Sequence, residues 1–409
     1  MPRPTLTTQW PDIPKIVGDD NYQFFLQSGT YGEIKEKYMG DSIKFWNDVA
    51  AHPNYDEWWK ARDARRNCYN IKPAVLIVGG LFDAEDCYGA WNIYKAISQQ
   101  SPDTDIRLVE GPWFHGGWAR SAGDRLGNVW FGSKTSVDYL KNFELPFFNY
   151  HLLGKGSVKE IAKANIFITG ENKWHQFTQW PPKEAKEQFI YLNKDDALSF
   201  TKSDLTNSFD EYVSDPMKPV PYTEDVHWKR TREYMSDDQR FASRRPDVLT
   251  YQTETLQENL TLTGPVIADL FTSISTTDAD FVVKLIDVFP DDFKYPDSLD
   301  MKYPMGGYQM LVRGEIMRGR FRNSFEKPEA FIPGKITEVK FELPDVAHTF
   351  LKGHRLMIQV QSTWYPLADR NPQQFIDTYT CESKDLLKSE IQIFHDAQHD
   401  SKIILPVLR

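Results

Sequence analysis

One stretch of the chain alternates between strand-like and helix-like spacing of its hydrophobic residues. Residues 74–80 (AVLIVGG) are continuously apolar, which is typical of a strand buried on both faces of a parallel sheet. Apolar side chains then recur at i, i+3, i+4 and i+7 over residues 90–97, so we expect one face of a helix there. The polar stretch 98–105 contains a proline that ends this helix, and the apolar positions of 106–109 predict the next strand. This order predicts part of an α/β domain.

Beyond about residue 157 the pattern becomes that of a β protein. Residues 337–343 and 356–361 alternate apolar and polar side chains, as strands with one buried face do. Shorter apolar runs predict further strands at 165–169, 189–192, 266–274 and 281–289. With proline and glycine turns between them, these strands indicate a β-sandwich. Residues 200–245 are rich in Asp, Ser and Arg, and they predict a long surface excursion.

Two regions of helical character flank the α/β stretch. Residues 1–68 mix aromatic and charged side chains and predict a helical layer. Residues 134–153 predict a closing helix, although Pro146 should end or kink it. The boundaries expected from sequence are therefore 1–68 for a helical segment, 69–156 for the α/β part and 157–409 for the β-sandwich.

Composition and charge exclude several classes of function. The net charge of −10 and the isoelectric point near 5.5 argue against nucleic acid as a partner. Three widely spaced cysteines, Cys68, Cys87 and Cys381, predict neither a disulfide framework nor a zinc site. No signal peptide is visible at Met1, and no apolar run approaches the roughly 20 residues that a membrane span needs. We expect a soluble chain with no membrane partner, and its compartment and any homo-oligomer stay open.

An acid and a histidine each follow one of the two strands predicted within the α/β stretch. Asp83 comes just after the apolar run ending at Gly80, and His115 follows the second strand and its Gly111-Pro112 turn. The carboxyl ends of parallel strands meet at one edge of a sheet, which is where catalytic groups collect. A carboxylate there can orient an imidazole that accepts a proton from a serine. The alternative is that Asp83 is a turn or cap residue and that His115 is merely solvated.

Three longer motifs carry a resemblance to a known family. The sequence reads HPNYDEWW at 52–59, GGLFDAED at 79–86 and GPWFHGGWAR at 111–120, with further likeness at RPDVL, DVFP, GHR and LPV in the C-terminal half. These motifs strongly resemble the α-amino-acid ester hydrolases, which belong with cocaine esterase, glutaryl-7-aminocephalosporanic acid acylase and X-Pro dipeptidyl-peptidase. The resemblance covers nearly the whole chain. It implies the C-terminal part of an α/β-hydrolase fold with a helical cap segment, followed by a jelly-roll β-sandwich.

The resemblance assigns roles to four residues. Asp83 matches the triad acid, His115 the triad base, and Glu85 with Asp86 two members of a carboxylate cluster that holds the substrate's α-ammonium group. Three acids within four residues crowd like charges, which is costly unless a cation binds there or one acid stays protonated. The alternative for Glu85 and Asp86 is that they complement the dipole of the following helix, worth about 0.3–1 kcal/mol.

The family's nucleophile is the main departure. No G-x-S-x-G lies upstream of Asp83, and Ser28-Gly29-Thr30-Tyr31 is not a nucleophile elbow because no strand run leads into it. We therefore expect the C-terminal portion of a larger hydrolase: a truncated sequence, a separate subunit beside an N-terminal hydrolase half, or a degenerate descendant.

Two classes of function follow. The first is a serine hydrolase acting on a small ester or amide with a free α-amino group, with X-Pro dipeptidyl-peptidase or glutaryl acylase as variants. The carboxylates at Glu85 and Asp86 count against the acylase. The second is a non-catalytic binding or assembly module.

No cofactor or metal is expected. The HDAQHD segment at 395–400 carries an i, i+4 histidine pair that could chelate zinc, but the family ends in a similar surface segment without a metal. Asp287, with the acids after it in VFPDD, could hold calcium, although a turn is the simpler interpretation. His348 and His354 are interpreted as structural.

Overall fold

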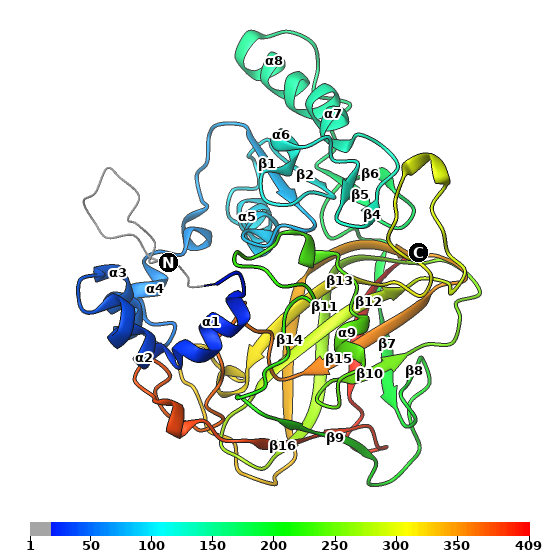
Figure 1. Cartoon of the computed structure of the whole chain (residues 1–409). Helices are drawn as coiled ribbons and strands as arrows, with labels where there is room; N and C mark the ends of the chain where they lie inside the picture. Colours follow the sequence, from blue (N-terminus) through cyan, green and yellow to red (C-terminus); the bar gives the residue numbers. More distant parts are fainter. Residues whose placement is uncertain (1–17) are drawn as a thin grey trace.

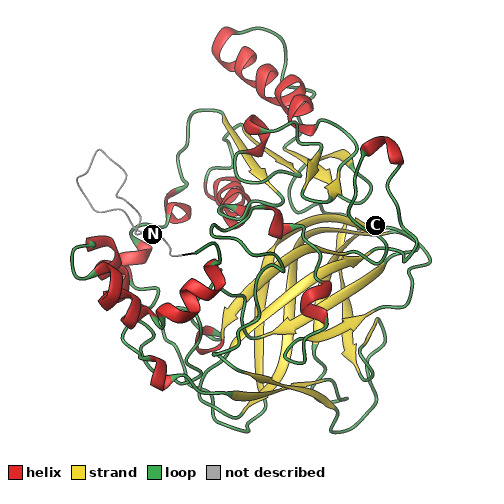
Figure 2. Ribbon diagram, viewed as in Figure 1, coloured by secondary structure: helices red, strands yellow, loops and turns green. Residues whose placement is uncertain are grey.

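The computed structural model describes residues 18–409, which form an α/β part packed on a larger β-sandwich (Figures 1 and 2). A four-stranded sheet in the order β1-β2-β5-β6 makes the α/β part. Its strands are β1 (Val75–Gly80), β2 (Ile106–Gly111), β5 (Ala164–Ile168) and β6 (Lys173–Phe177). The first three run parallel and β6 is antiparallel. The strands expected at 74–80, 106–109 and 165–169 are thus confirmed within one residue at their starts.

The crossover between β1 and β2 is α5 (Cys87–Gln100), the helix expected from the apolar spacing of 90–97. Its apolar face buries Trp91, Tyr94 and Ile97 against the sheet. The parallel register pairs Gly80 with Gly111, so the two strands end at the same level. Whatever follows each strand therefore meets at one sheet edge.

The β-sandwich is built from eleven paired strands. They are β7 (Ala185–Asn193), β8 (Ala197–Ser199), β9 (Phe209–Ser214), β10 (Leu249–Gln252), β11 (Leu260–Ile274), β12 (Asp280–Val288), β13 (Gln309–Arg318), β14 (Thr337–Phe350), β15 (Arg355–Gln361), β16 (Ser389–Phe394) and β17 (Lys402–Leu408). β11 pairs with β14 on one side and with β16 and β17 on the other, and register shifts bend it. Apolar side chains from these strands enclose a core separate from that of the α/β part. The fold is α/β plus β-sandwich, as expected from sequence.

Short helices make up the described part of the predicted helical segment, and residues 1–17 lie outside the described residues. These helices are α1 (Asn21–Ser28), α2 (Tyr31–Ile34), a π-helical turn (Lys35–Met39), α3 (Lys44–Ala51) and α4 (Glu57–Lys60), with a 3₁₀ turn at Ala64–Asn67. Thr30 and Glu33 form a capping box that starts α2. Thr30 also donates from its hydroxyl to the Cys381 carbonyl, and Tyr31 stacks on Tyr379. The helices therefore pack against a loop of the β-sandwich.

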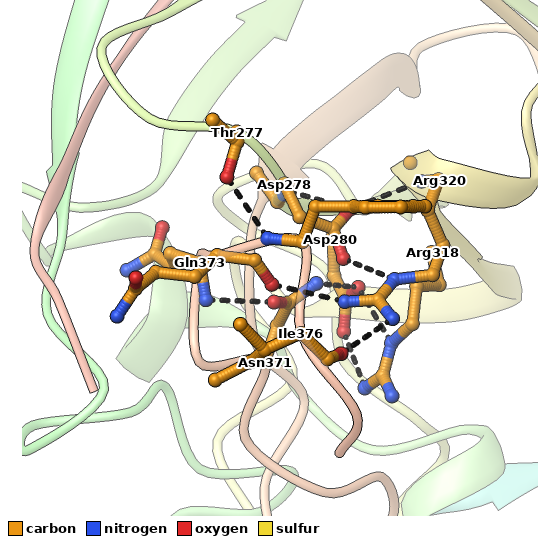
Figure 3. A network of polar contacts seen from close by, with 12 residues as sticks. Thr277, Asp278, Asp280, Arg318, Arg320, Asn371, Gln373 and Ile376 are labelled. Carbon is orange, nitrogen blue, oxygen red and sulfur yellow. Dashed lines mark hydrogen bonds and ion pairs between the residues drawn. The ribbon is translucent and has the colours of Figure 1, made fainter. Parts of the chain in front are cut away.

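A buried ion-pair network holds that loop in place (Figure 3). Arg318, at the end of β13, contacts Asp280 at 3.1 Å and Asp369 at 2.7 Å. Arg320 contacts Asp278 at 2.6 Å and donates to the backbone carbonyls of residues 374 and 376. Breaking such a pair would leave an uncompensated buried charge. The loop that carries Tyr379 is thereby fixed to the β12–β13 hairpin.

The expected closing helix continues past its proline without ending there, and its backbone is π-helical for one turn just before it. It consists of α7 (Thr135–Tyr139), a π-helical turn (Leu140–Glu144) and α8 (Leu145–Leu153). Pro146 is the second residue of α8, so the change from α-helical to π-helical hydrogen bonding comes in the turn just before the proline, where its missing N–H would have bonded. The remaining short elements are β3 (Arg125–Leu126), β4 (Val129–Trp130), α6 (Gly117–Arg120), α9 (Arg240–Ser243) and 3₁₀ turns at Glu233–Met235, Asp297–Leu299, Gly319–Phe321 and Ser383–Asp385.

The structure corrects the expectation for residues 200–245. The stretch 200–245 is not only a surface excursion, because it contributes β9 to the large sheet and buries Tyr222, Tyr234 and Gln239. Its polar composition hid aromatic residues that pack between the two parts of the fold.

The smaller sheet extends past residue 156 into β5 and β6, so the domain boundaries remain a proposal. Within residues 18–409, no helix is long and apolar enough to cross a membrane.

Candidate active site

The two loops that follow β1 and β2 interlock at the sheet edge. The Leu81 amide donates to the Gly111 carbonyl at 2.8 Å, and the Phe82 amide donates to the Trp113 carbonyl at 3.1 Å. The loops approach so closely that a Cβ on Gly80 would lie 2.2 Å from the Trp113 carbonyl oxygen. Glycine is therefore required at Gly80, and the interlocked backbones determine where the next side chains point.

Asp83 and His115 meet across this edge. Asp83 Oδ2 lies 3.0 Å from His115 Nδ1, and the Asp83 side chain is 2% exposed. Its second oxygen, Oδ1, accepts the backbone amides of Glu85 at 2.8 Å and Asp86 at 2.9 Å. An acid held in this way fixes the orientation of the imidazole and stabilises its protonated form. The His115 side chain remains 38% exposed, so its Nε2 edge can be reached.

Two further carboxylates flank the same imidazole. Asp86 Oδ2 lies 3.5 Å from His115 Nδ1, and Glu85 Oε2 lies 3.9 Å from His115 Nε2. Asp86 occupies the N-cap position of α5, but its side chain makes no capping hydrogen bond. A purely helix-capping role therefore does not account for its position. The structure brings together all four residues singled out from the sequence.

One contact at this cluster was not predicted. Arg230, from the polar stretch before α9, donates to Glu85 Oε1 at 2.8 Å and to the Ala84 carbonyl at 2.8 Å. Part of the negative charge expected to face a substrate is thus already paired in the structure. Sequence spacing gave no signal for this contact because 145 residues separate the partners.

A cavity of about 600 Å³ opens beside the cluster, a size typical of small-molecule sites. Its walls come from the segments after β1 and β2 and from the segment between β9 and α9. They consist of Ala84, Glu85, Phe114, His115, Arg120, His227, Trp228, Lys229, Arg230, Thr231, Arg232 and Glu233. Seven of these twelve residues lie in 227–233, the stretch that the sequence presented as a polar excursion.

A buried arginine from the β-sandwich supports the Asp83 turn from below. Arg313, on β13, donates to the Leu81 carbonyl at 2.8 Å, to Cys87 Sγ at 2.9 Å and to the Asp345 carbonyl at 3.0 Å. It is 2% exposed and spans the two parts of the fold. The acid's position therefore depends on the β-sandwich as well as on its own sheet.

Glu110 lies buried beneath the same edge. Neither of its carboxyl oxygens has a hydrogen-bond partner among residues 18–409, and the side chain is fully buried. Burial, only partly offset by the charge of Arg313, raises the pKa of Glu110 well above its ordinary value. A Cβ on Gly79 would lie 2.3 Å from its carboxyl oxygen, so the glycine pair also makes room for this group.

The histidines considered for metal binding lie in ordinary surroundings. Asp396 of the HDAQHD segment accepts the backbone amides of Gln398 and His399, so this segment is a turn rather than a helix. His348 and His354 both contact buried Asp287, at 3.2 and 2.8 Å. Among residues 18–409, the grouping with metal-ligand geometry is the cluster Asp83, Asp86 and His115 itself, whose ligand atoms lie within 4.8 Å of one another.

Within residues 18–409, no hydroxyl group hydrogen-bonds to His115. Ser28 ends α1, where its hydroxyl donates to the Phe24 carbonyl at 2.7 Å, and Thr30 caps α2. This agrees with the expectation that Ser28-Gly29-Thr30-Tyr31 does not form a nucleophile elbow.

The fold and site place an acid–histidine pair at the edge of an α/β sheet that is joined to a β-sandwich. Residues 14–117 match the family described as X-Pro dipeptidyl-peptidase (S15 family). Residues 158–404 match the family described as the X-Pro dipeptidyl-peptidase C-terminal non-catalytic domain. The chain belongs to this family of serine hydrolases, in agreement with the resemblance found in the sequence.

Several relatives are similar over most of the chain. An aminopeptidase from a marine-sediment Thaumarchaeota archaeon is 36% identical, with a TM-score of 0.89 over 96% of this chain and 64% of its own. An α-amino acid ester hydrolase is 34% identical, with a TM-score of 0.90 over 96% of this chain and 65% of its own. Cocaine esterase of Rhodococcus sp. (strain MB1 Bresler) is 28% identical over 89% of this chain and 61% of its own. The chain thus spans less than two thirds of the length of these relatives.

Proposed function

We propose that Asp83 and His115 are the acid and base of a serine-hydrolase triad that acts on small esters or amides bearing a free α-amino group. The observation that carries this proposal is the pairing of a buried, doubly hydrogen-bonded Asp83 with an accessible His115 flanked by two more carboxylates. Two of the relatives, an aminopeptidase and an α-amino acid ester hydrolase, are named for substrates that carry an amine.

The proposed chemistry is acyl transfer. A serine hydroxyl attacks the substrate carbonyl while His115 Nε2 takes its proton, and His115 then returns that proton to the leaving group. Asp83 keeps Nδ1 protonated and stabilises the imidazolium. Asp86 and Glu85 bind the α-ammonium group, because a compact cation among carboxylates gains Coulomb and hydrogen-bond energy. The serine is the third group that this mechanism requires.

The remaining features of the proposal concern architecture. We propose that the β-sandwich is a jelly roll, that the helices of residues 18–68 belong to a cap, and that the boundaries lie near 68 and 156. X-Pro dipeptidyl-peptidase activity is the variant within the same class, because it too needs a site for an amine. Glutaryl acylase activity fits less well, since an acidic acyl group would face Glu85 and Asp86.

The amine requirement is tested by binding. Calorimetry compares D-phenylglycine methyl ester with methyl phenylacetate, which lacks the amine, on the chain and on Asp86→Asn. We expect the amine to tighten binding about tenfold or more, since a charged hydrogen bond is worth about 1.5–3 kcal/mol. The preference should disappear in Asp86→Asn and persist in Asp103→Asn, an exposed acid outside the cluster. Equal affinity for both esters on the unmodified chain would sink the proposal.

The base is tested by turnover. In a form of the protein that supplies the required serine, hydrolysis of the amino ester should be abolished by His115→Ala and should fall by about 10⁴ in Asp83→Asn, which holds the wrong tautomer. Turnover that survives His115→Ala would show that this pair does not do the chemistry.

A non-catalytic binding or assembly module is the second candidate. It is favoured by the absence of a hydroxyl bonded to His115 within residues 18–409 and by β1, which in that range pairs on one side only, with β2. An unpaired parallel edge is a template for another strand. This candidate predicts amine-dependent binding with no turnover.

A further inference from the structure

The cavity beside His115 is lined by more positive than negative charge. Four of its lining side chains are cationic, Arg120, Lys229, Arg230 and Arg232, and two are acidic, Glu85 and Glu233. Binding of an ammonium group alone does not account for this excess of positive charge. The positions of these cations therefore need a separate explanation.

Two of the four cations already contact a carboxylate, whereas Lys229 lies over the Trp228 ring at 4.6 Å. Arg230 is fixed by Glu85 and the Ala84 carbonyl. Arg232 lies over the Phe114 ring at 4.2 Å, with its Nε 3.5 Å from Glu233. In contrast, no carboxylate among residues 18–409 comes within 4.0 Å of Arg120 or Lys229. These two form what we call the basic wall, and both side chains are exposed at the cavity.

We propose that the basic wall, Arg120 and Lys229, binds the carboxylate of a substrate's leaving group. This inference rests on the proposed function, because it places the substrate's amine at Glu85 and Asp86. The substrate's carboxylate then lies on the basic wall of the same cavity. The site would then prefer zwitterionic α-aminoacyl compounds, such as short peptides with both termini free.

The dimensions and chemistry agree with such a ligand. Two extended residues span at most about 7 Å, which a cavity of about 600 Å³ accommodates. The planar guanidinium of Arg120 can donate two parallel hydrogen bonds to a carboxylate, and Lys229 adds a second positive charge. Arg230 contributes indirectly, since its contact with Glu85 keeps that acid from repelling an incoming carboxylate.

The test uses three peptides on the full 409-residue chain. Calorimetry at low salt compares phenylalanyl-glycine with its C-terminal amide and with its N-acetyl derivative. We expect the free carboxylate to bind about tenfold tighter than the amide, the loss typical of one charge-assisted contact. This difference should vanish in Arg120→Gln/Lys229→Gln and persist in Lys155→Gln, whose exposed side chain does not line the cavity. It should also shrink between about 0.01 M and about 1 M ionic strength, because exposed charges are screened.

The outcomes separate this inference from the proposed function. If the amide binds as tightly as the free peptide, or if the double variant keeps the difference, the basic wall does not bind a carboxylate. If phenylglycine methyl ester binds while phenylalanyl-glycine does not, the inference alone is overturned. If the N-acetyl peptide binds as well as the free amine while the amide binds weakly, the carboxylate site stands and the ammonium site fails.

Discussion

Lys284 provides the sharpest test of the energetics of the β-sandwich. It lies in the middle of β12 and is 0% exposed, and among residues 18–409 its side chain makes one hydrogen bond, from Nζ to Gln239 Oε1 at 2.9 Å. The rings of Trp364 and Phe241 lie 5.3 and 6.0 Å from its Nζ. Burial lowers the pKa of Lys284 from 10.5 to about 7. A charged Lys284 amine therefore destabilises the folded state.

The sign and size of the effect follow from this shift. Above pH 10.5 the amine is neutral in both states, and as pH falls toward 7 the unfolded chain gains the proton first and is stabilised. One pKa unit corresponds to about 1.4 kcal/mol, so the penalty is about 4 kcal/mol at pH 7 and about 1 kcal/mol at pH 10. Lys284→Met removes the penalty but leaves Gln239 without its donor, at a cost of about 1 kcal/mol. The variant should gain about 3 kcal/mol at pH 7 and almost nothing at pH 10.

The assay is urea unfolding followed by tryptophan fluorescence at both pH values. Lys155→Met, at an exposed position, is the matched control and should show no such pH dependence. A stability difference between Lys284→Met and the unmodified chain that is the same at pH 7 and pH 10 would refute the charge-burial argument. A loss of stability at pH 7 would show that packing and the Gln239 contact outweigh the charge penalty.

Three further predictions concern the site. Glu110→Gln should unfold at a higher urea concentration than the unmodified chain at neutral pH. Burial raises the pKa of Glu110 in the folded state, so above pH 4.5 the unfolded chain loses the proton first and the unmodified fold is destabilised. The difference in stability between the variant and the unmodified chain should therefore widen as pH rises above 4.5. Arg313→Ala should lower the free energy of unfolding by about 3 kcal/mol or more, since the Leu81 and Asp345 carbonyls lose their donor. The NMR signals of His115 should shift in this variant, while those of His395 should not. Arg230→Gln should tighten D-phenylglycine methyl ester by up to about fivefold in calorimetry, because it frees Glu85 from an exposed ion pair, and unchanged affinity would contradict this.

Sequence spacing was a sufficient guide to the acid and the histidine. The apolar runs before Asp83 and His115 define parallel neighbours, and parallel neighbours end at the same edge, so the pair follows from local pattern plus one topological rule. The alternating strand at 337–343 was found for a similar reason, since one face of it is buried. Residues 356–361 also form a strand, but the expectation of one exposed face was wrong there, because Met357, Gln359 and Gln361 are buried as well.

The missed features share a physical cause. Arg230 and Arg313 act on the Asp83 turn across 145 and 232 residues of chain, and no local periodicity encodes a contact at that range. Glu110 was hidden because an acid in a strand is normally read as a solvent-facing position. Only the glycine pair at 79–80 gave a signal, since it marks a close approach of another segment.

These long-range contacts change how the site is to be understood. Asp83 and His115 come from the α/β part, but the Leu81 carbonyl beside Asp83 is held by Arg313 of β13, and the far wall of the cavity is residues 227–233. A half-site carried by the α/β part alone would lack both the support of Arg313 and most of the charged side chains that line the cavity. The β-sandwich is therefore a structural component of the site, whichever of the two proposed functions holds. Substitutions on β13 should then alter ligand binding without touching a ligand.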